Sequence, residues 1–314
     1  VHCVKACPRN AMQGTKMQPQ TPLTRDLVLI GGGHSHALVL RRWGMAPLPG
    51  VRLTLINPGP TAPYSGMLPG HIAGHYTREE LDIDLVRLGR FAGARLIVAH
   101  TTGIDPQAGH ITTDIGREIS YDMASIDIGI TARMAQLPGF ADHAIPAKPL
   151  DNYAAAWRDF LARLDAGKVA AEVAVIGAGV AGVELSMAMA HAMRARGTRP
   201  RVTLIERGPC LSGVPPRAEA RLRRALDANG VTLMTGAQVR RVTESGIDLA
   251  EGAPVPAALT VGAAGSFAHG WLAETPLPLE GGFIRVDRCL RVEGHDTLFA
   301  VGDCAHMAHA PRPK

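Results

Sequence analysis

The apolar positions along the chain predict two βαβ units, each consisting of a strand, a helix and a second strand. In the first unit, residues 27–30 form a short apolar run without alternation, as expected for a parallel strand buried on both faces. This run leads directly into Gly31, a helical stretch follows through residues 37–42 and ends near Gly44, and residues 51–56 form the next strand. The order strand, glycine turn, helix, strand is that of a nucleotide-binding unit.

The second unit repeats this pattern later in the chain. Residues 173–191 carry only one charge, Glu184, and therefore also have to be weighed as a membrane span. A glycine fingerprint interrupts this stretch, and its β-branched residues lie mainly in the first part, so a buried strand at 173–176 followed by a turn and a helix explains it better. The helix is predicted to extend to about Arg196, and residues 201–205 form the next strand. No transmembrane segment is expected.

The rest of the chain has β character. Residues 137–152, with three prolines, are interpreted as the link into the second unit. A helix is expected at 218–228, followed by strands at 231–234, 283–286 and 297–301. Short strand candidates separated by Asp-Pro and Gly turn signals predict a β-meander appended to a parallel sheet, at 94–98, 109–113 and 119–126. The predicted fold class is α/β, with two Rossmann-like dinucleotide-binding domains and β-meander additions.

Composition excludes several classes of protein. Apolar residues make up 46% of the 314 residues and charged residues 19%, which rules out wholesale disorder. Aromatic residues make up only 4%, which argues against recognition of RNA or single strands by base stacking. The net charge of the chain is +5. The basic residues are scattered except for one small arginine cluster, which is interpreted as a solvated helix face rather than a nucleic-acid patch: Arg217, Arg221, Arg223 and Arg224. No nucleic-acid partner is expected.

The cysteines and the N-terminus indicate a reducing compartment. Five dispersed cysteines are too few for a disulfide framework: Cys3, Cys7, Cys210, Cys289 and Cys304. Residues 1–25 lack the apolar core of a signal peptide, so a cytoplasmic location is predicted. Cys3 and Cys7, followed by Pro8, match the last two ligands of a bacterial ferredoxin motif, but two thiolates cannot hold a [4Fe–4S] cluster.

The second glycine turn carries every feature of a dinucleotide site. Gly177 permits the tight turn, Gly179 lets the backbone approach a pyrophosphate, and Gly182 allows close packing of helix on strand. The helix begins at about Val180 and Ala181, whose N-terminal position faces the phosphates. Glu206 ends the next strand, where a carboxylate accepts hydrogen bonds from ribose hydroxyls and repels a 2′-phosphate. This favours NADH over NADPH, although the neighbouring Arg207 offers a partner for a phosphate.

The first glycine turn departs from the fingerprint at its third position. Gly31 and Gly33 keep two of the three glycines, His34 and Ser35 follow, and His36 stands where the third glycine would be. The strand after this turn ends in Asn57, which can hydrogen-bond a ribose but carries no charge.

These motifs together resemble the pyridine nucleotide-disulfide oxidoreductase superfamily of flavoproteins. The resemblance rests on the two turns, on the segment SIDIG at 125–129, which ends in Gly129, and on TLFAVGDCA at 297–305, with Gly302 and Asp303. It implies FAD in the first turn, NADH in the second, and a hydrogen bond between the FAD ribityl chain and the Asp303 carboxylate. Residues 31–45 and 63–77 are closer still to the NADH dehydrogenase-like proteins fused to or associated with selenide, water dikinase, which are similar to type II NADH dehydrogenases.

The resemblance also implies a domain arrangement. The FAD-binding domain is predicted to be discontinuous, comprising residues 25–150 and 281–314, with the NADH-binding domain inserted at 151–280. Residues 1–24 are predicted to be a disordered N-terminal extension. The C-terminal interface domain of the superfamily is expected to be absent, which would make the chain a fragment.

The implied chemistry is hydride transfer from NADH to flavin N5. Residues 45–100 contain no cysteine, so the dithiol of the superfamily's disulfide reductases is excluded, and electrons pass directly to a small-molecule acceptor such as a quinone. The resemblance assigns Glu184 a place beside nicotinamide and flavin, with a helix-surface glutamate as the alternative. It sets Tyr64 and Ser65 beside the isoalloxazine. Lys148 is interpreted either as a contact of the flavin or its phosphates or as a solvated loop residue.

Other interpretations of the sequence remain open at this point. His71 and His75 have the i,i+4 spacing of metal ligands, but no third ligand is evident and no metal is predicted. A sulfide- or selenide:quinone oxidoreductase would need reactive cysteines near the flavin, for which only Cys304 is placed. The protein would alternatively be a catalytically silent flavin-binding partner of selenide, water dikinase. A peripheral position at the inner face of a bacterial membrane is a further expectation.

Overall fold

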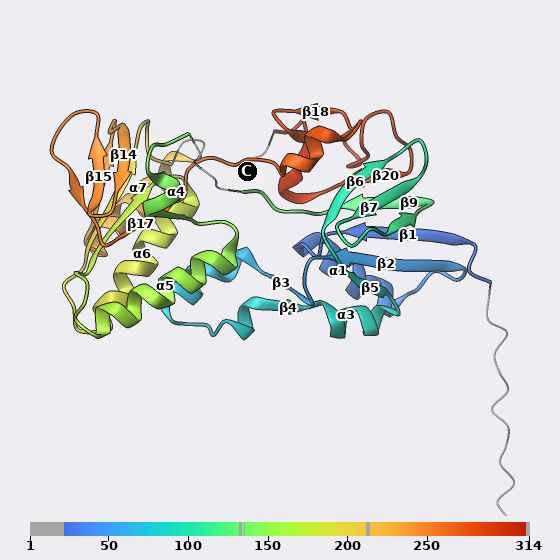
Figure 1. Ribbon diagram of the computed structural model, residues 1–314, viewed down its shortest axis with the longest axis horizontal. Coiled ribbons are helices and arrows are strands. Elements are labelled where there is room, and N and C mark those ends of the chain that lie inside the picture. The colour runs from blue at the N-terminus through green and yellow to red at the C-terminus, as the bar shows by residue number, and fades with distance from the viewer. Residues whose placement is uncertain (1–21, 132–133, 135, 212–213, 312–314) are drawn as a thin grey trace, which may run out of the picture.

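The chain forms two lobes, each built around a five-stranded parallel sheet (Figure 1). The computed structural model describes residues 22–311 except 132–133, 135 and 212–213. Cys3, Cys7 and nearly all of the predicted N-terminal extension therefore lie outside the described residues. None of the described helices is both long enough and apolar enough to cross a membrane.

The first sheet has the strand order β20-β9-β1-β2-β5. Ile30, the last residue of β1, lies opposite Ile56 on one side and Ile126 on the other, so the carboxyl ends of three strands meet at one edge. The strand bounds are Arg25–Ile30 for β1, Val51–Asn57 for β2, Arg95–Val98 for β5, Met123–Ile126 for β9 and Leu298–Ala300 for β20.

The two faces of the first sheet bury different layers. Leu29 packs with Leu40 and Leu85 of the two helices, whereas Val28 and Ile30 pack with residues of the small antiparallel sheet, in keeping with the alternation of side chains along a strand. Figure 1 shows the helices below the sheet and the antiparallel strands above it. The helices are α1 (His34–Met45) and α3 (Leu85–Ala92), and the antiparallel strands are β6 (Thr101–Asp105), β7 (His110–Thr113) and β8 (Glu118–Ser120).

The second sheet repeats this architecture with the order β10-β17-β11-β12-β13. Its strands are β10 (Ala144–Pro146), β11 (Glu172–Ile176), β12 (Arg201–Glu206), β13 (Val231–Thr235) and β17 (Leu259–Gly262). Val173 and Val175 pack in one cluster with residues of helices α5 (Leu150–Asp165), α6 (Val180–Arg194) and α7 (Pro216–Ala228). Ala174 and Ile176 face the antiparallel strands β14 (Val239–Thr243), β15 (Gly246–Leu249) and β16 (Val255–Pro256). The predicted α/β class with two Rossmann-like units is confirmed.

Three predicted segments differ in detail. Residues 94–98 extend the parallel sheet as β5 instead of joining the meander, because Gly93 ends α3 with a left-handed φ of +62° and the chain re-enters beside β2. The predicted strand at 119–126 is split in two: Asp122 donates its N–H to Asp26 O at 3.0 Å, and β9 begins at the next residue alongside β1. The predicted link at 137–152 holds a short helix, α4 (Phe140–His143), and β10, which pairs with β17.

One segment of the first half of the chain reaches the second lobe. After β3 (Thr61–Pro63) and a 3-10 turn, η1 (Ser65–Met67), helix α2 (Leu68–Ala73) packs against α6, and Ile72 O accepts a hydrogen bond from Trp157 Nε1 of α5 at 3.1 Å. The chain returns through η2 (Glu79–Leu81) and β4 (Asp82–Asp84), which pairs with β3. The C-terminal part adds η3 (Gly270–Glu274), β18 (Leu279–Glu280), β19 (Phe283–Arg285), η4 (Gly302–Cys304) and β21 (Ala305–His306).

Candidate functional site

The second glycine turn joins β11 to α6 at the carboxyl edge of its sheet. Gly177 has φ +106°, and Gly179 caps the helix in an extended conformation without any side-chain hydrogen bond. No atom lies within 4 Å of the position that a Cβ on Gly179 would take, whereas one on Gly182 would overlap the carbonyl oxygen of Gly177. The turn thus brings helix and strand into backbone contact and leaves the helix N-terminus open, with Val180 and Ala181 exposed in its first turn.

Glu206 fixes this turn from the end of β12. Its Oε2 accepts the N–H of Ala178 at 2.8 Å, and its Oε1 accepts that of Gly208 at 2.9 Å. Both carboxylate oxygens therefore hold backbone at the mouth of the turn. A half-buried carboxylate in this position adds negative charge where the strand ends, which is the feature on which the predicted preference for NADH rests.

The first turn has the same backbone shape. Gly31 has φ +89°, and Gly33 caps α1 with φ −60° and ψ 172°, close to the −69° and 177° of Gly179. Asn57 at the end of β2 accepts the N–H of Gly32 at 2.8 Å, the role that Glu206 has for Ala178. No acidic residue lies in the first turn of α1, where His34 and Ser35 are the first two residues.

His36 replaces the third glycine with a buried side-chain bridge. Its Nδ1 lies 2.7 Å from Gly31 O and its Nε2 lies 2.8 Å from Ser125 Oγ of β9. Because the carbonyl only accepts, Nδ1 carries the proton and Nε2 accepts from the serine hydroxyl. Burial lowers the pKa of His36 and keeps the ring neutral, while the nearby Asp127 charge and the Gly31 hydrogen bond act in the opposite direction.

A third loop comes to the same edge of the first sheet after β20. Gly302, with φ +71°, lies against Asp127, and Asp303 follows in η4. The Asp303 carboxylate pairs with Lys148 Nζ at 3.1 Å across 155 residues. Of the two interpretations of Lys148, the geometry brings it to the predicted ribityl ligand rather than leaving it as an isolated loop residue.

The predicted flavin-side residues lie near the first turn. The Tyr64 ring stacks on His34 of α1 with centroids 4.8 Å apart and 23° between the planes, and it is 37% exposed. Ser65 opens the 3-10 turn and is exposed. Gly129, three residues beyond the end of β9, has no atom within 4 Å of its Cβ position, so the backbone is accessible there.

Comparison with known proteins decides the family. The family model described as pyridine nucleotide-disulphide oxidoreductase matches residues 25–313. The chain belongs to this family. An NADH dehydrogenase-like protein of Mycobacterium tuberculosis is 34% identical over 224 residues, which are 68% of this chain and 56% of that protein. The NADH dehydrogenase-like protein YutJ of Bacillus subtilis is 28% identical over 91% of this chain and 78% of its own length. The chain thus spans just over half the length of the mycobacterial relative.

Solved structures agree on the fold. A ferredoxin reductase of Rhodopseudomonas palustris superposes with a TM-score of 0.74 at 23% identity, covering 90% of this chain and 69% of that one. The sulfide:quinone oxidoreductase of Aquifex aeolicus superposes with a TM-score of 0.75 at 20% identity, with the same coverage. Members of the pyridine nucleotide-disulphide oxidoreductase family use FAD and NAD(P)H, which confirms the cofactor prediction at the level of the family.

The two turns fit these cofactors in this member of the family. Each offers a glycine-capped helix N-terminus without a side-chain cap, and backbone N–H groups there stabilise phosphates. Each also has a polar side chain at the end of the following strand, Asn57 or Glu206. The first turn differs from this plan in one neighbour: the carboxylate of Asp127, which follows β9, accepts the N–H of His36 at 2.9 Å.

Glu184 lies on the exposed side of α6, one turn after Val180. The structure places it near the helix N-terminus, on the same element as the second turn. Whether it lies beside a bound nicotinamide stays a prediction.

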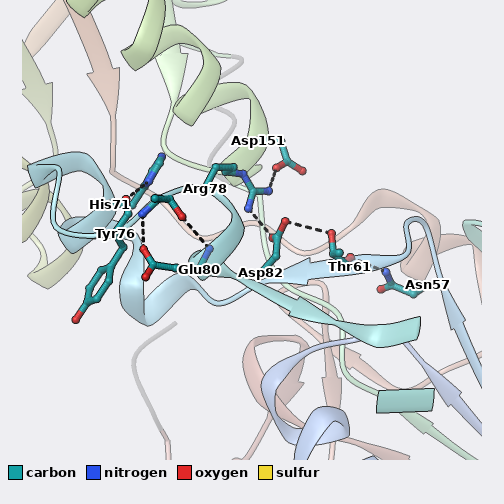
Figure 2. Close-up of polar contacts among 9 residues, drawn as sticks. Asn57, Thr61, His71, Tyr76, Arg78, Glu80, Asp82 and Asp151 are labelled. Carbon is teal, nitrogen blue, oxygen red and sulfur yellow. Dashed lines mark hydrogen bonds and ion pairs between the residues drawn. The ribbon is translucent and has the colours of Figure 1, made fainter. Parts of the chain in front are cut away.

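The sequence did not predict a series of hydrogen bonds and ion pairs that connects the first turn to the second lobe (Figure 2). Asn57 Nδ2 donates to Thr61 O at 3.2 Å, and Thr61 Oγ1 donates to Asp82 at 3.3 Å. Arg78 pairs with Asp82 at 2.5 Å and also with Asp151 of α5. Figure 2 shows the guanidinium between the two carboxylates. An arginine four residues before an aspartate was the only local signal for this link.

His71 and His75, which have the spacing of metal ligands, and the Cys304 thiol all contact other groups of the protein. His71 Nδ1 lies 2.9 Å from Tyr76 O, and the His75 ring lies 5.2 Å from that of His191. In the described part of the chain, no group of three or more His, Cys, Asp or Glu side chains could hold a metal ion. Cys304 is buried, and its thiol lies 3.2 Å from Val301 O.

Proposed function

We propose that the chain binds FAD at the first turn and NADH at the second and acts as an NADH:acceptor oxidoreductase. The observation that carries the proposal is the pair of like-built turns, each at the carboxyl edge of its own parallel sheet. Ligands of open α/β sheets bind at this edge. The names of the relatives, two of them NADH dehydrogenase-like proteins, support the same activity.

Each group of residues has its own task in this proposal. The N-termini of α1 and α6 present backbone N–H groups to the phosphates, and Asp303, held by Lys148, offers a carboxylate to a hydroxyl of the FAD chain. Glu206 accepts ribose hydroxyls and disfavours a 2′-phosphate. Bound FAD would supply the two-electron acceptor for a hydride from NADH. Tyr64 and Ser65 border its flat ring, and Glu184 positions the nicotinamide.

We further propose that electrons leave directly for a small acceptor of the quinone class. Residues 45–100 contain no cysteine, so a dithiol relay of the kind found in disulfide reductases has no residues to use. A relative in Synechocystis, 27% identical over 61% of this chain, is a demethylphylloquinone reductase. The sulfide- or selenide-oxidising alternative is less well supported, because the buried Cys304 thiol is engaged with backbone carbonyls.

An anaerobic absorption spectrum tests the hydride step. Adding NADH to the flavin-loaded protein is expected to bleach the yellow flavin band, because the second turn delivers the nicotinamide to the flavin. Bound flavin that NADH fails to bleach would instead support the silent flavin-binding partner. Addition of a water-soluble quinone to the reduced protein is expected to restore the flavin band. If no quinone restores it, this class of acceptor is rejected.

Two finer expectations rest on motif resemblance alone. The association with selenide, water dikinase depends on residues 31–45 and 63–77, and co-purification of the two proteins from the native host tests it. A peripheral membrane position is tested by sedimentation with vesicles of bacterial lipid. Recovery of the protein only in the supernatant would contradict it.

A further inference from the structure

The two sheets place an aspartate and an alanine at the same position beside the two turns. Asp127 follows Ile126, the residue opposite Ile30, and its N–H donates to Ile30 O at 2.8 Å. In the second lobe, Ala263 follows Gly262, the residue opposite Ile176, and its N–H donates to Ile176 O at 2.8 Å. The backbone of these two residues is therefore equivalent, and the side chain is the difference.

The Asp127 side chain is directed into the first turn. Its Oδ2 accepts the N–H of His36 in the first turn of α1 at 2.9 Å, and the residue is only 6% exposed. Both carboxylate oxygens lie 2.5–2.6 Å from the position that a Cβ on Gly33 would take, and one lies 2.8 Å from that position on Gly302. The corresponding space at Gly179 in the second turn is empty.

A carboxylate at this place has a definite electrostatic consequence. The N-terminal end of a helix stabilises negative charge through its free N–H groups and its dipole. Asp127 already supplies one negative charge there and occupies one of those N–H groups. A pyrophosphate at the same helix end would meet like charge in a poorly solvated place, where screening is weak. The second turn, with Ala263, has no carboxylate at this position; its own carboxylate, Glu206, lies at the end of β12.

We propose that Asp127 sets the affinity of the first turn for the pyrophosphate of its cofactor by opposing it electrostatically. The inference rests on the proposed FAD site. The first turn thus has a carboxylate beside its helix N-terminus, on the residue that follows β9, whereas the second turn has Ala263 at that position and its carboxylate, Glu206, at the end of β12.

Binding titrations on the flavin-free protein test this inference. Asp127→Asn keeps an oxygen for the His36 N–H and removes the charge, so its Kd for FAD, from quenching of flavin fluorescence, is expected to be about tenfold lower than that of the unmodified protein. The mirror variant Ala263→Asp is expected to raise the Kd for NADH about tenfold. Ala263→Asn adds similar bulk without charge and is expected to raise it far less.

The outcomes separate this inference from the function on which it rests. If the unmodified protein binds FAD and Asp127→Asn binds it equally or more weakly, the carboxylate helps the cofactor and the inference is wrong. If Ala263→Asn weakens NADH binding as much as Ala263→Asp, bulk rather than charge is responsible and the inference is again wrong. If neither the protein nor any variant binds FAD, the assignment of the first turn fails and takes the inference with it. Equal thermal unfolding midpoints establish that the variants compared are folded.

Discussion

The first and second glycine turns reach one backbone shape by opposite means at their third position. Gly182 packs against the carbonyl oxygen of Gly177 so closely that a Cβ has no room. In the first turn, His36 fills the equivalent position, and its ring joins Gly31 O to Ser125 Oγ. The absence of a side chain at Gly182 allows α6 to pack closely against β11, and the hydrogen-bonded ring of His36 holds α1 against β1. The glycine fingerprint is therefore one solution to a packing problem and not a requirement of the fold.

The strand ends show a second difference within the same plan. Asn57 and Glu206 both accept the N–H of the middle residue of their turn, at 2.8 Å in each case. The amide also donates to Gly59 O and Thr61 O, whereas the carboxylate accepts twice and adds charge. The hydrogen bond that Asn57 and Glu206 have in common stabilises the backbone of each turn. We expect the remaining atoms, an amide NH2 group in Asn57 and a charged oxygen in Glu206, to distinguish the FAD site from the NADH site.

The largest expected effect comes from adding one carbon to the second turn. In Gly182→Ala the new methyl group overlaps Gly177 O, so helix α6 has to move away from β11. We expect a loss of about 3 kcal/mol in the free energy of unfolding, measured by urea denaturation, together with loss of NADH binding. Gly179→Ala is the control, because its φ of −69° suits alanine and its Cβ meets no atom. An equally stable Gly182→Ala would show that the two turns differ less than the structure indicates.

Removing the His36 ring is expected to have the next largest effect. In His36→Ala, Gly31 O and Ser125 Oγ lose their partner in the protein interior, at a cost of about 2 kcal/mol. Ser125→Ala is the matched variant, since it removes only one of the two hydrogen bonds and should cost about 1 kcal/mol. Denaturation curves of both variants measure the difference. If His36→Ala were as stable as the natural chain, the ring would not be what holds the first turn.

How far the sequence could predict these features depends on their range along the chain. Apolar runs next to glycines identified both βαβ units because strand, turn and helix are local patterns. The docking of α2 on α6 was not predictable, since nothing in residues 68–73 shows which surface they will cover. Helix α5 did carry a signal, because Leu150, Trp157 and Leu164 recur at seven-residue spacing and are all buried.

The candidate site follows the same division. The turn glycines and Glu206 lie where their motifs put them. Asp127 lies in the segment SIDIG, but the motif assigned it no role, and its equivalence to Ala263 appears only once the register of the two parallel sheets is known. The Lys148–Asp303 pair joins residues 155 positions apart, beyond the reach of any local pattern.

Removing the charge of Glu206 is expected to change the selectivity of the second turn between NADH and NADPH. Glu206→Gln keeps an oxygen for the Ala178 N–H but removes the negative charge, which makes the second strand end resemble that of Asn57. We expect the preference for NADH over NADPH to fall about tenfold through the loss of charge repulsion with the 2′-phosphate. The ratio of the two Kd values measures it, with Arg207→Ala as the control for the neighbouring cation. An unchanged ratio would refute the ribose assignment.

Titration of His36 is expected to make the stability of the first turn depend on pH, with a smaller effect on the free energy of unfolding than the substitutions above. Burial lowers the pKa of His36 in the folded chain below the value of 6.5 that it has when unfolded. The unfolded chain therefore binds a proton first, and the stability that His36 contributes is present above pH 6.5 and is lost as the pH falls towards the folded pKa. His36→Gln, which does not titrate, is expected to show a shallower loss of stability between about pH 7 and about pH 5. Parallel curves would mean that the pKa of His36 is the same in the folded and unfolded chains and that burial does not lower it.

The smallest expected effect is at Lys148, and its size is informative. Lys148 and Asp303 are 32% and 41% exposed, so water screens their attraction, and Lys148→Met should change the free energy of unfolding by no more than about 0.5 kcal/mol. Asp303 would nonetheless lose the cation that holds it at the first turn, so FAD release should be faster than in the natural chain. Lys168→Met, on an exposed turn outside the site, is the control. A large loss of stability without a change in FAD release would mean that the ion pair stabilises the fold by joining two distant segments of the chain and that Lys148 does not affect the FAD site.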